Sequence, residues 1–192
     1  MPLITLAELA LREGNNALAL AHAQAALDIA IEVQARQWEV LALWHLGNAE
    51  LALGRHIVAA AAFERGHTVA LAIGAATSQN ATAGLARVAL AQGDVSRATR
   101  TIEGLLAHLA GGGSLHGTEQ PRLIELVCHQ VLARAGDPRA AAMLARAHTV
   151  LQTVAATIAD PPLRQSYLAN IPEHRAIIKA WAAQREVPAG GR

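Results

Sequence analysis

Four glycines recur along the chain, 40, 39 and 43 residues apart: Gly14, Gly54, Gly93 and Gly136. Each is followed five residues later by an alanine, and these are Ala19, Ala59, Ala98 and Ala141. Self-similarity at a period of this size predicts a stack of helical hairpins, because one hairpin alone cannot bury its apolar face.

The residues around these glycines are typical of a tight turn between two helices. Glycine adopts the left-handed conformation that ends an α-helix without steric cost. Asn15, Asp94 and Asp137 come next and are good N-caps for a following helix, whereas Arg55 is not. Pro138 stands at the first helical position after Asp137, where a missing N–H costs little.

Small residues recur at fixed offsets from the turns. A Leu-small pair precedes three of the glycines, as Leu6-Ala7, Leu46-Gly47 and Leu85-Ala86, whereas the fourth repeat has Cys128-His129. Four residues after the repeat alanines come Ala23, Phe63, Ile102 and Ala145. We expect the alanines to lie where paired helices cross closely, so a large residue at Ala59 or Ala98 should cost about 1–3 kcal/mol.

The composition fits an all-α fold with a core of Ala and Leu. The chain is 53% hydrophobic but only 3% aromatic, and Ala has the highest helix propensity. Residues that favour strands are too sparse to build a sheet. We expect helix pairs over 2–13 and 16–34, 36–53 and 56–74, 77–92 and 95–110, and 119–135 and 138–159, with shorter helices near 162–170 and 172–185.

These ranges predict one domain over residues 1–185, with repeats near 1–34, 36–74, 77–110 and 119–159 and a C-terminal cap at 162–185. Residues 111–118 begin with three glycines and a serine, which predicts a flexible linker within the domain. We expect residues 186–192 to form a disordered tail.

Both ends of the expected stack carry apolar side chains. At the C-terminus Pro162 and Pro172 start two short helices, and an apolar stripe at helical spacing predicts a cap: Tyr167, Leu168, Ile171, Ile177, Ile178 and Trp181. At the N-terminus Met1 to Leu11 is apolar without a polar capping helix before it. We expect either a cut from a longer chain or pairing of this face with a partner or second copy.

The Leu-small, Gly and Ala pattern resembles the tetratricopeptide (TPR) consensus, although its period exceeds the about 34 residues of that repeat. The segments 160–168 and 171–177 resemble the closing part of TPR arrays in large bacterial regulators of the MalT/LuxR or ATPase/cyclase-associated type. The resemblance implies a right-handed α-α superhelix of about four hairpins. Motifs for ATPase or cyclase activity are absent, so those activities do not carry over.

In TPR stacks the first helix of each hairpin lines a concave groove. The resemblance therefore implies these partner-binding candidates: Glu8, Arg12, Trp44, Asn48, Asn80, Arg87, Gln130 and Arg134. Asn48 stands where carboxylate-gripping TPR domains place an Asn, but the basic partners of that clamp are not matched, so we do not predict it. A solvated polar face is an equal alternative for Asn48 and Arg87, and packing is the favoured alternative for Trp44.

Catalytic, metal and cofactor motifs are not found. Nine His residues occur without an H-E-x-x-H pattern, and the glycines at 111–113 lack the G-K-[ST] of a phosphate loop. Glu125, Cys128 and His129 come closest to a site. Adjacent residues on a helix point about 100° apart, so Cys128 and His129 are not a nucleophile–base pair, and a packed thiol is the expected role. We expect no enzyme activity.

Charge and hydropathy favour a cytoplasmic protein that binds neither nucleic acid nor membranes. The net charge is +1, without the clustered basic residues that phosphate binding needs. No signal peptide is evident at the N-terminus, and Ala-rich stretches such as 57–63 are too short to span a bilayer. The single cysteine excludes an intrachain disulfide.

The sequence therefore predicts a protein–protein interaction scaffold, or a docking or sensor arm of a bacterial regulator, that binds a peptide or partner domain in its groove. One alternative is a homodimeric structural module that associates through the N-terminal helix. Another is a regulatory domain that senses a small ligand.

Overall fold

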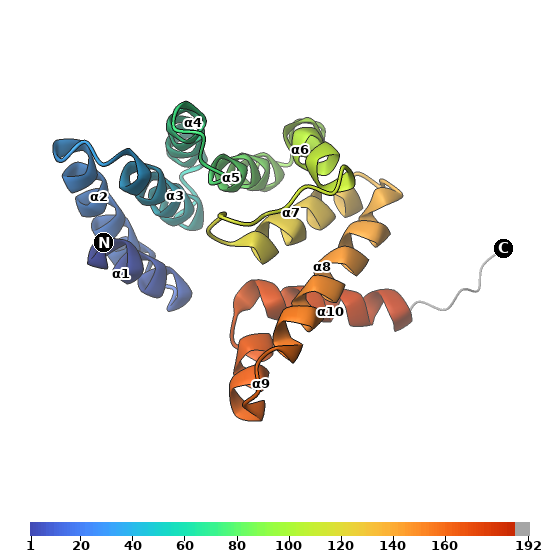
Figure 1. Cartoon of the computed structure of the whole chain (residues 1–192). Coiled ribbons are helices and arrows are strands. Elements are labelled where there is room, and N and C mark those ends of the chain that lie inside the picture. The colour runs from blue at the N-terminus through green and yellow to red at the C-terminus, as the bar shows by residue number, and fades with distance from the viewer. Residues whose placement is uncertain (187–192) are drawn as a thin grey trace. The chain divides into compact units, whose positions relative to one another are not determined.

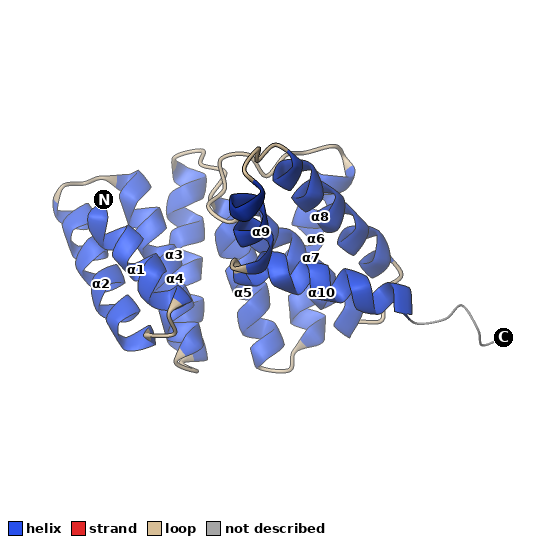
Figure 2. Cartoon of the chain, turned by 90° about the horizontal axis from the view of Figure 1, so that it is seen from below, coloured by secondary structure: helices blue, strands red, loops and turns tan. Residues whose placement is uncertain are grey.

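A computed structural model describes residues 1–186, which form ten helices and no strand (Figure 2). The expected all-α class is confirmed. The helices are α1 Pro2–Arg12, α2 Asn16–Glu32, α3 Arg36–Ala52, α4 His56–Ala72, α5 Ser78–Ala91, α6 Val95–Ala110, α7 Pro121–Arg134, α8 Arg139–Ala156, α9 Pro161–Ala169 and α10 Pro172–Glu186.

Contacts divide the chain into two compact units, Met1–Pro121 and Arg122 onward, and each is described by itself. The boundary falls at the start of α7, so one domain over 1–185 and the number of repeats stay predictions. Glu186 ends α10, and the rest of the predicted tail, residues 187–192, lies outside the described residues.

The first unit consists of three successive hairpins, α1–α2, α3–α4 and α5–α6 (Figure 1). Each helix packs against the next one in the chain, and α3 also contacts α1 and α5 directly. The first helices of the hairpins therefore form one layer. We call its surface the α1–α3–α5 face.

The predicted glycine turns are confirmed. Gly14, Gly54, Gly93 and Gly136 all have φ between 66° and 77°, and each comes two residues after its helix ends. The N-caps at Asn15 and Asp94 form as expected, since their Oδ1 atoms accept the amides of Leu18 at 3.3 Å and Arg97 at 2.8 Å. The fourth helix pair departs from the prediction, because α8 begins at Arg139 with Pro138 as its N-cap.

Gln34 occupies the left-handed position between α2 and α3, with φ 55°. A non-glycine residue there costs about 1–2 kcal/mol. We expect Gln34→Gly to recover part of this cost and raise the free energy of unfolding by about 1 kcal/mol, measured by urea denaturation. Gly54→Ala creates the same strain at the next turn and should therefore lower the free energy of unfolding.

The small positions of the repeat are buried in the first unit. Ala19, Ala59 and Ala98 are fully buried, as are Phe63 and Ile102 one turn further on. In the second unit the prediction is wrong, because Ala141 is exposed and the buried positions are Leu144, Ala147 and Leu151. In the first repeat the buried Ala23 lies nine residues after its turn glycine, Gly14. In the second unit the buried Leu144 lies only eight residues after Gly136, so the buried positions of α8 come one residue earlier than the repeat predicts.

The segment after α6, predicted to be a flexible linker, carries specific contacts. Leu115 is buried, and its carbonyl accepts a hydrogen bond from Thr118 Oγ1 at 2.6 Å. His108 Nε2 lies 2.9 Å from the Ser114 carbonyl oxygen. These contacts tie the segment to the first unit.

The second unit has its core between α7, α8 and α10. Ile177 of α10 is fully buried in a cluster with Leu126 of α7 and Leu144, Ala147 and Leu151 of α8. Four residues of the predicted capping stripe pack around this cluster: Tyr167, Leu168, Ile178 and Trp181. The stripe therefore covers the apolar side of the α7–α8 pair.

Candidate partner-binding face

The α1 part of the α1–α3–α5 face carries an ion pair. Arg12 Nη2 lies 2.6 Å from Glu8 Oε1, one helical turn away, and both side chains are partly exposed. An exposed pair at this spacing stabilises a helix by only about 0.3–0.5 kcal/mol. Both groups therefore stay free to exchange this pairing for one with a ligand.

His45 is the buried member of this face. It lies on α3, is 1% exposed, and neither ring nitrogen has a hydrogen-bond partner among residues 1–186. Burial lowers the pKa of His45 to about 4, while the Glu8 carboxylate raises that pKa and the Arg12 guanidinium lowers it. The ring is therefore neutral at pH 7 and close enough to the α1 pair to sense its charge.

Sequence reasoning missed His45 and chose Trp44 in its place. His45 lies three residues and Trp44 four residues before Asn48, so either could share its helix face. Helical periodicity alone cannot tell which of the two does. The structure does: the Trp44 indole packs against Phe63 of α4, with ring centroids 5.5 Å apart. Trp44 is a buried packing residue, as the alternative interpretation held.

Asn48 and Arg87 are brought together across two helices. Arg87 Nη1 donates a short hydrogen bond to Asn48 Oδ1, and Asn48 Nδ2 donates to the Trp44 carbonyl at 2.8 Å. The amide of Asn48 is therefore fixed by its own helix and in turn positions the guanidinium of α5. A guanidinium has five donor hydrogens in a rigid fork, which suits it to carboxylates and carbonyl groups.

Asn80 has a structural role. Its side chain is 1% exposed, and its Oδ1 accepts the backbone amide of Glu119 at 2.9 Å. This bond holds the end of the segment after α6 against the start of α5. Asn80 Nδ2 is buried without a hydrogen-bond partner.

A hollow of about 540 Å³ opens beside this anchor. Its walls come from α3, through Trp38 and Leu41, from the turn at 75–77, and from Gly117 and Glu119. Trp38 is 41% exposed. Partial burial raises the pKa of Glu119, and the Glu8 carboxylate raises it further. The hollow thus combines an aromatic surface with a carboxylate, and sequence reasoning identified neither Trp38 nor Glu119.

The two remaining candidates, Gln130 and Arg134, lie on α7 in the second unit. Both are exposed, and they belong to the surface of that unit.

The expected packed thiol at Cys128 is confirmed. Cys128 is fully buried, and burial, followed by the Glu125 carboxylate, raises the pKa of its thiol to about 12. The Glu125 carboxylate lies between Arg122 Nη1 at 2.8 Å, an ion pair without hydrogen-bond geometry, and Arg146 Nε at 3.3 Å. His129 Nδ1 lies 3.1 Å from the Ala140 carbonyl oxygen. Glu125 and His129 therefore have different polar partners.

Within residues 1–186, no three His, Cys, Asp or Glu side chains lie close enough together to hold a metal ion. None of the described helices combines the length and apolar character needed to cross a lipid bilayer.

The described residues form an all-helical protein, and in its first unit three successive hairpins pack side by side. Comparisons with protein-family models, with curated proteins and with solved structures found no match. Membership of the TPR family therefore stays a prediction from the sequence.

Proposed function

We propose that this chain is a protein-interaction module that binds a peptide or partner domain on the α1–α3–α5 face. The observation that supports this proposal most is that polar side chains occur on the first helices of three successive hairpins: Glu8 and Arg12 on α1, Asn48 on α3 and Arg87 on α5. Charged groups such as Arg12 and Arg87 recognise peptide carbonyls and carboxylates by charge-assisted hydrogen bonds, and the buried Asn48 amide holds the Arg87 guanidinium in position.

The hollow beside Glu119 adds a second feature to the same proposal. A partly exposed Trp is a common anchor in protein interfaces, and Glu119 would attract a basic group on the partner. In this proposal the chain is a docking or sensor arm of a cytoplasmic bacterial signalling or transcription regulator, a setting that rests on the TPR resemblance.

Arg87→Ala tests the proposed face. A partner is first trapped by photo-crosslinking from position 91, one turn along α5, and then purified for titration calorimetry. We expect Arg87→Ala to weaken its binding at least about tenfold, or about 1.4 kcal/mol, because the guanidinium fork is lost. Arg100→Ala, an exposed arginine on α6, is the matched control. Equal binding by wild type and Arg87→Ala, with both folded by circular dichroism, would exclude this face.

Self-association through α1 is the second candidate function. Leu6 and Leu9 of α1 are 43% and 50% exposed, whereas Leu3 packs against the core and is a poor test position. If α1 pairs with a second copy, light scattering should give a mass that rises with concentration, and Leu9→Glu should return it to that of the monomer. Leu71→Glu, on α4 and also exposed, should leave the association intact. A constant monomer mass in the wild type would remove this candidate.

A further inference from the structure

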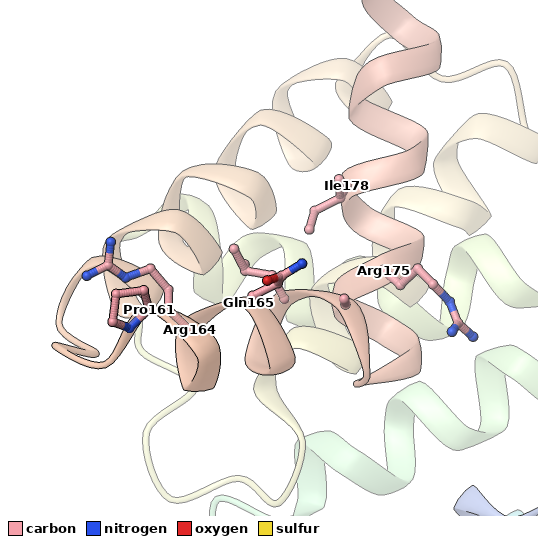
Figure 3. Close-up of a pocket in the computed structure, with 7 residues that line it drawn as sticks. Pro161, Arg164, Gln165, Arg175 and Ile178 are labelled. Atoms are coloured by element: carbon pink, nitrogen blue, oxygen red, sulfur yellow. The ribbon is translucent and has the colours of Figure 1, made fainter.

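The second unit carries an apolar hollow of its own. It lies between α9 and α10 and has a volume of about 470 Å³ (Figure 3). Leu168 of α9 and Ile178 of α10 line it, and both side chains also pack against the core of the unit. The hollow is therefore a gap in the apolar side of the cap, and its walls belong to side chains that pack against the core.

Two arginines stand at opposite ends of this hollow (Figure 3). Arg164 is held in place because its Nε and Nη2 donate to the Ile158 carbonyl at 3.0 and 2.8 Å. Arg175 is exposed, and no hydrogen bond or ion pair of its guanidinium is found among residues 1–186. Positive charge therefore flanks an apolar floor. The Arg175 guanidinium is available for pairing, and Arg164, whose Nε and Nη2 donate to the Ile158 carbonyl, keeps the hydrogens of Nη1 for a ligand.

We propose that the α9–α10 hollow docks a helical segment of a partner protein, with an apolar side chain in the hollow and carboxylates at the two arginines. Charge complementarity identifies this occupant. Arg175 can pair with a carboxylate in a bidentate manner, and Arg164 can donate to a second carboxylate from Nη1. Their positions at opposite ends of the hollow call for two separated carboxylates. An amphipathic helix supplies both carboxylates on one face with an apolar residue between them.

The size of the hollow agrees with such an anchor. Recognition sites of several hundred Å³ accept large side chains, and an apolar Leu or Phe anchor gains binding free energy when it leaves water. The walls need no rearrangement, because Leu168 and Ile178 are already fixed by the core. This surface is separate from the α1–α3–α5 face, so the proposal does not depend on the function proposed there.

The probe is a capped, alanine-based peptide of about 16 residues, long enough to form a helix. Its Leu residues share one face, with Glu one turn before and one turn after them, and a matched peptide has Gln in place of Glu. Binding to the full chain is measured by fluorescence anisotropy. We expect the Glu peptide to bind, and the Gln peptide to bind at least tenfold more weakly.

Two pairs of variants locate the site. Arg175→Glu should weaken binding of the Glu peptide at least tenfold, whereas Lys179→Glu, the same charge change one turn along α10, should change it less than twofold. Ala169→Phe, which fills the hollow from its rim, should abolish binding, whereas Ala182→Phe on the exposed part of α10 should not.

Several results would overturn the proposal. These are no binding at millimolar peptide, equal affinity for the Glu and Gln peptides, and equal losses in Arg175→Glu and Lys179→Glu. Dodecanoate is tested as a competitor of the Glu peptide. If it bound the hollow more tightly than the peptide does, the occupant would be a free apolar acid and not a helix.

Discussion

Acidification from pH 7 to pH 4 is expected to remove about 3 kcal/mol from the free energy of unfolding, because His45 resists protonation in the folded chain. Burial holds the pKa of His45 at about 4, compared with 6.5 for a histidine in water. Each pKa unit corresponds to about 1.4 kcal/mol, and the loss is about 2 kcal/mol by pH 5.

The sign follows from where the proton binds. Between pH 6.5 and pH 4 the unfolded chain binds a proton at His45 and the folded chain does not, so lowering the pH favours unfolding. Above pH 6.5 the ring is neutral in both the folded and the unfolded chain, so the free energy of unfolding is not lowered by protonation of His45. The Glu8 carboxylate opposes this effect and the Arg12 guanidinium strengthens it, but burial is the largest cause.

His45→Leu should abolish this part of the pH dependence. At pH 7 the variant should be as stable as wild type or more so, because its side chain leaves no buried ring nitrogen without a partner. At pH 5 it should exceed wild type by about 2 kcal/mol. His116→Leu, at an exposed position after α6, is the control and should follow the wild-type profile. The free energy of unfolding is measured by urea titration from pH 4 to pH 8. If it changed with pH equally in His45→Leu and wild type, the pH dependence would not come from His45.

The helical elements could be predicted because their signals are local. A glycine at positive φ and a capping side chain next to it determine a turn within a few residues, and this was sufficient at Gly14 and Gly93. The prediction for α8 was wrong at Ala141, because one residue is missing between Gly136 and the buried positions of α8. A fixed offset from the glycine cannot detect such a deletion.

The candidate site was only partly predictable, for two physical reasons. The register of the TPR-like repeat placed Asn48 and Arg87 on one face, and they do meet. Helical periodicity within α3 could not choose between Trp44 and His45. The position of Glu119 depends on the path of the segment after α6, which is fixed by its hydrogen bond to Asn80, 39 residues away in sequence. No local pattern encodes that contact.

Gly47→Ala and Gly84→Ala are each expected to lower the free energy of unfolding by about 1–3 kcal/mol, although Ala is the better helix former. The Phe63 ring of α4 lies against the backbones of α3 and α5 at these two glycines. A Cβ at Gly47 would lie 2.5 Å from Phe63 Cε1, and a Cβ at Gly84 would lie 2.6 Å from Phe63 Cδ1. The ring is fully buried and cannot move away from one helix without meeting the other.

Gly104→Ala is the matched control, because Gly104 lies in α6 with no atom near an added Cβ. Its substitution should stabilise the chain by up to about 1 kcal/mol through helix propensity alone. A double-mutant cycle then assigns the cost to the ring: Gly84→Ala should lose most of its effect when combined with Phe63→Leu, which removes the clashing edge. If Gly84→Ala destabilised both backgrounds equally, the cost would lie in the helix and not in contact with Phe63. The small residue of the Leu-small pair is therefore a glycine at position 47, because any Cβ there would collide with the Phe63 ring of α4.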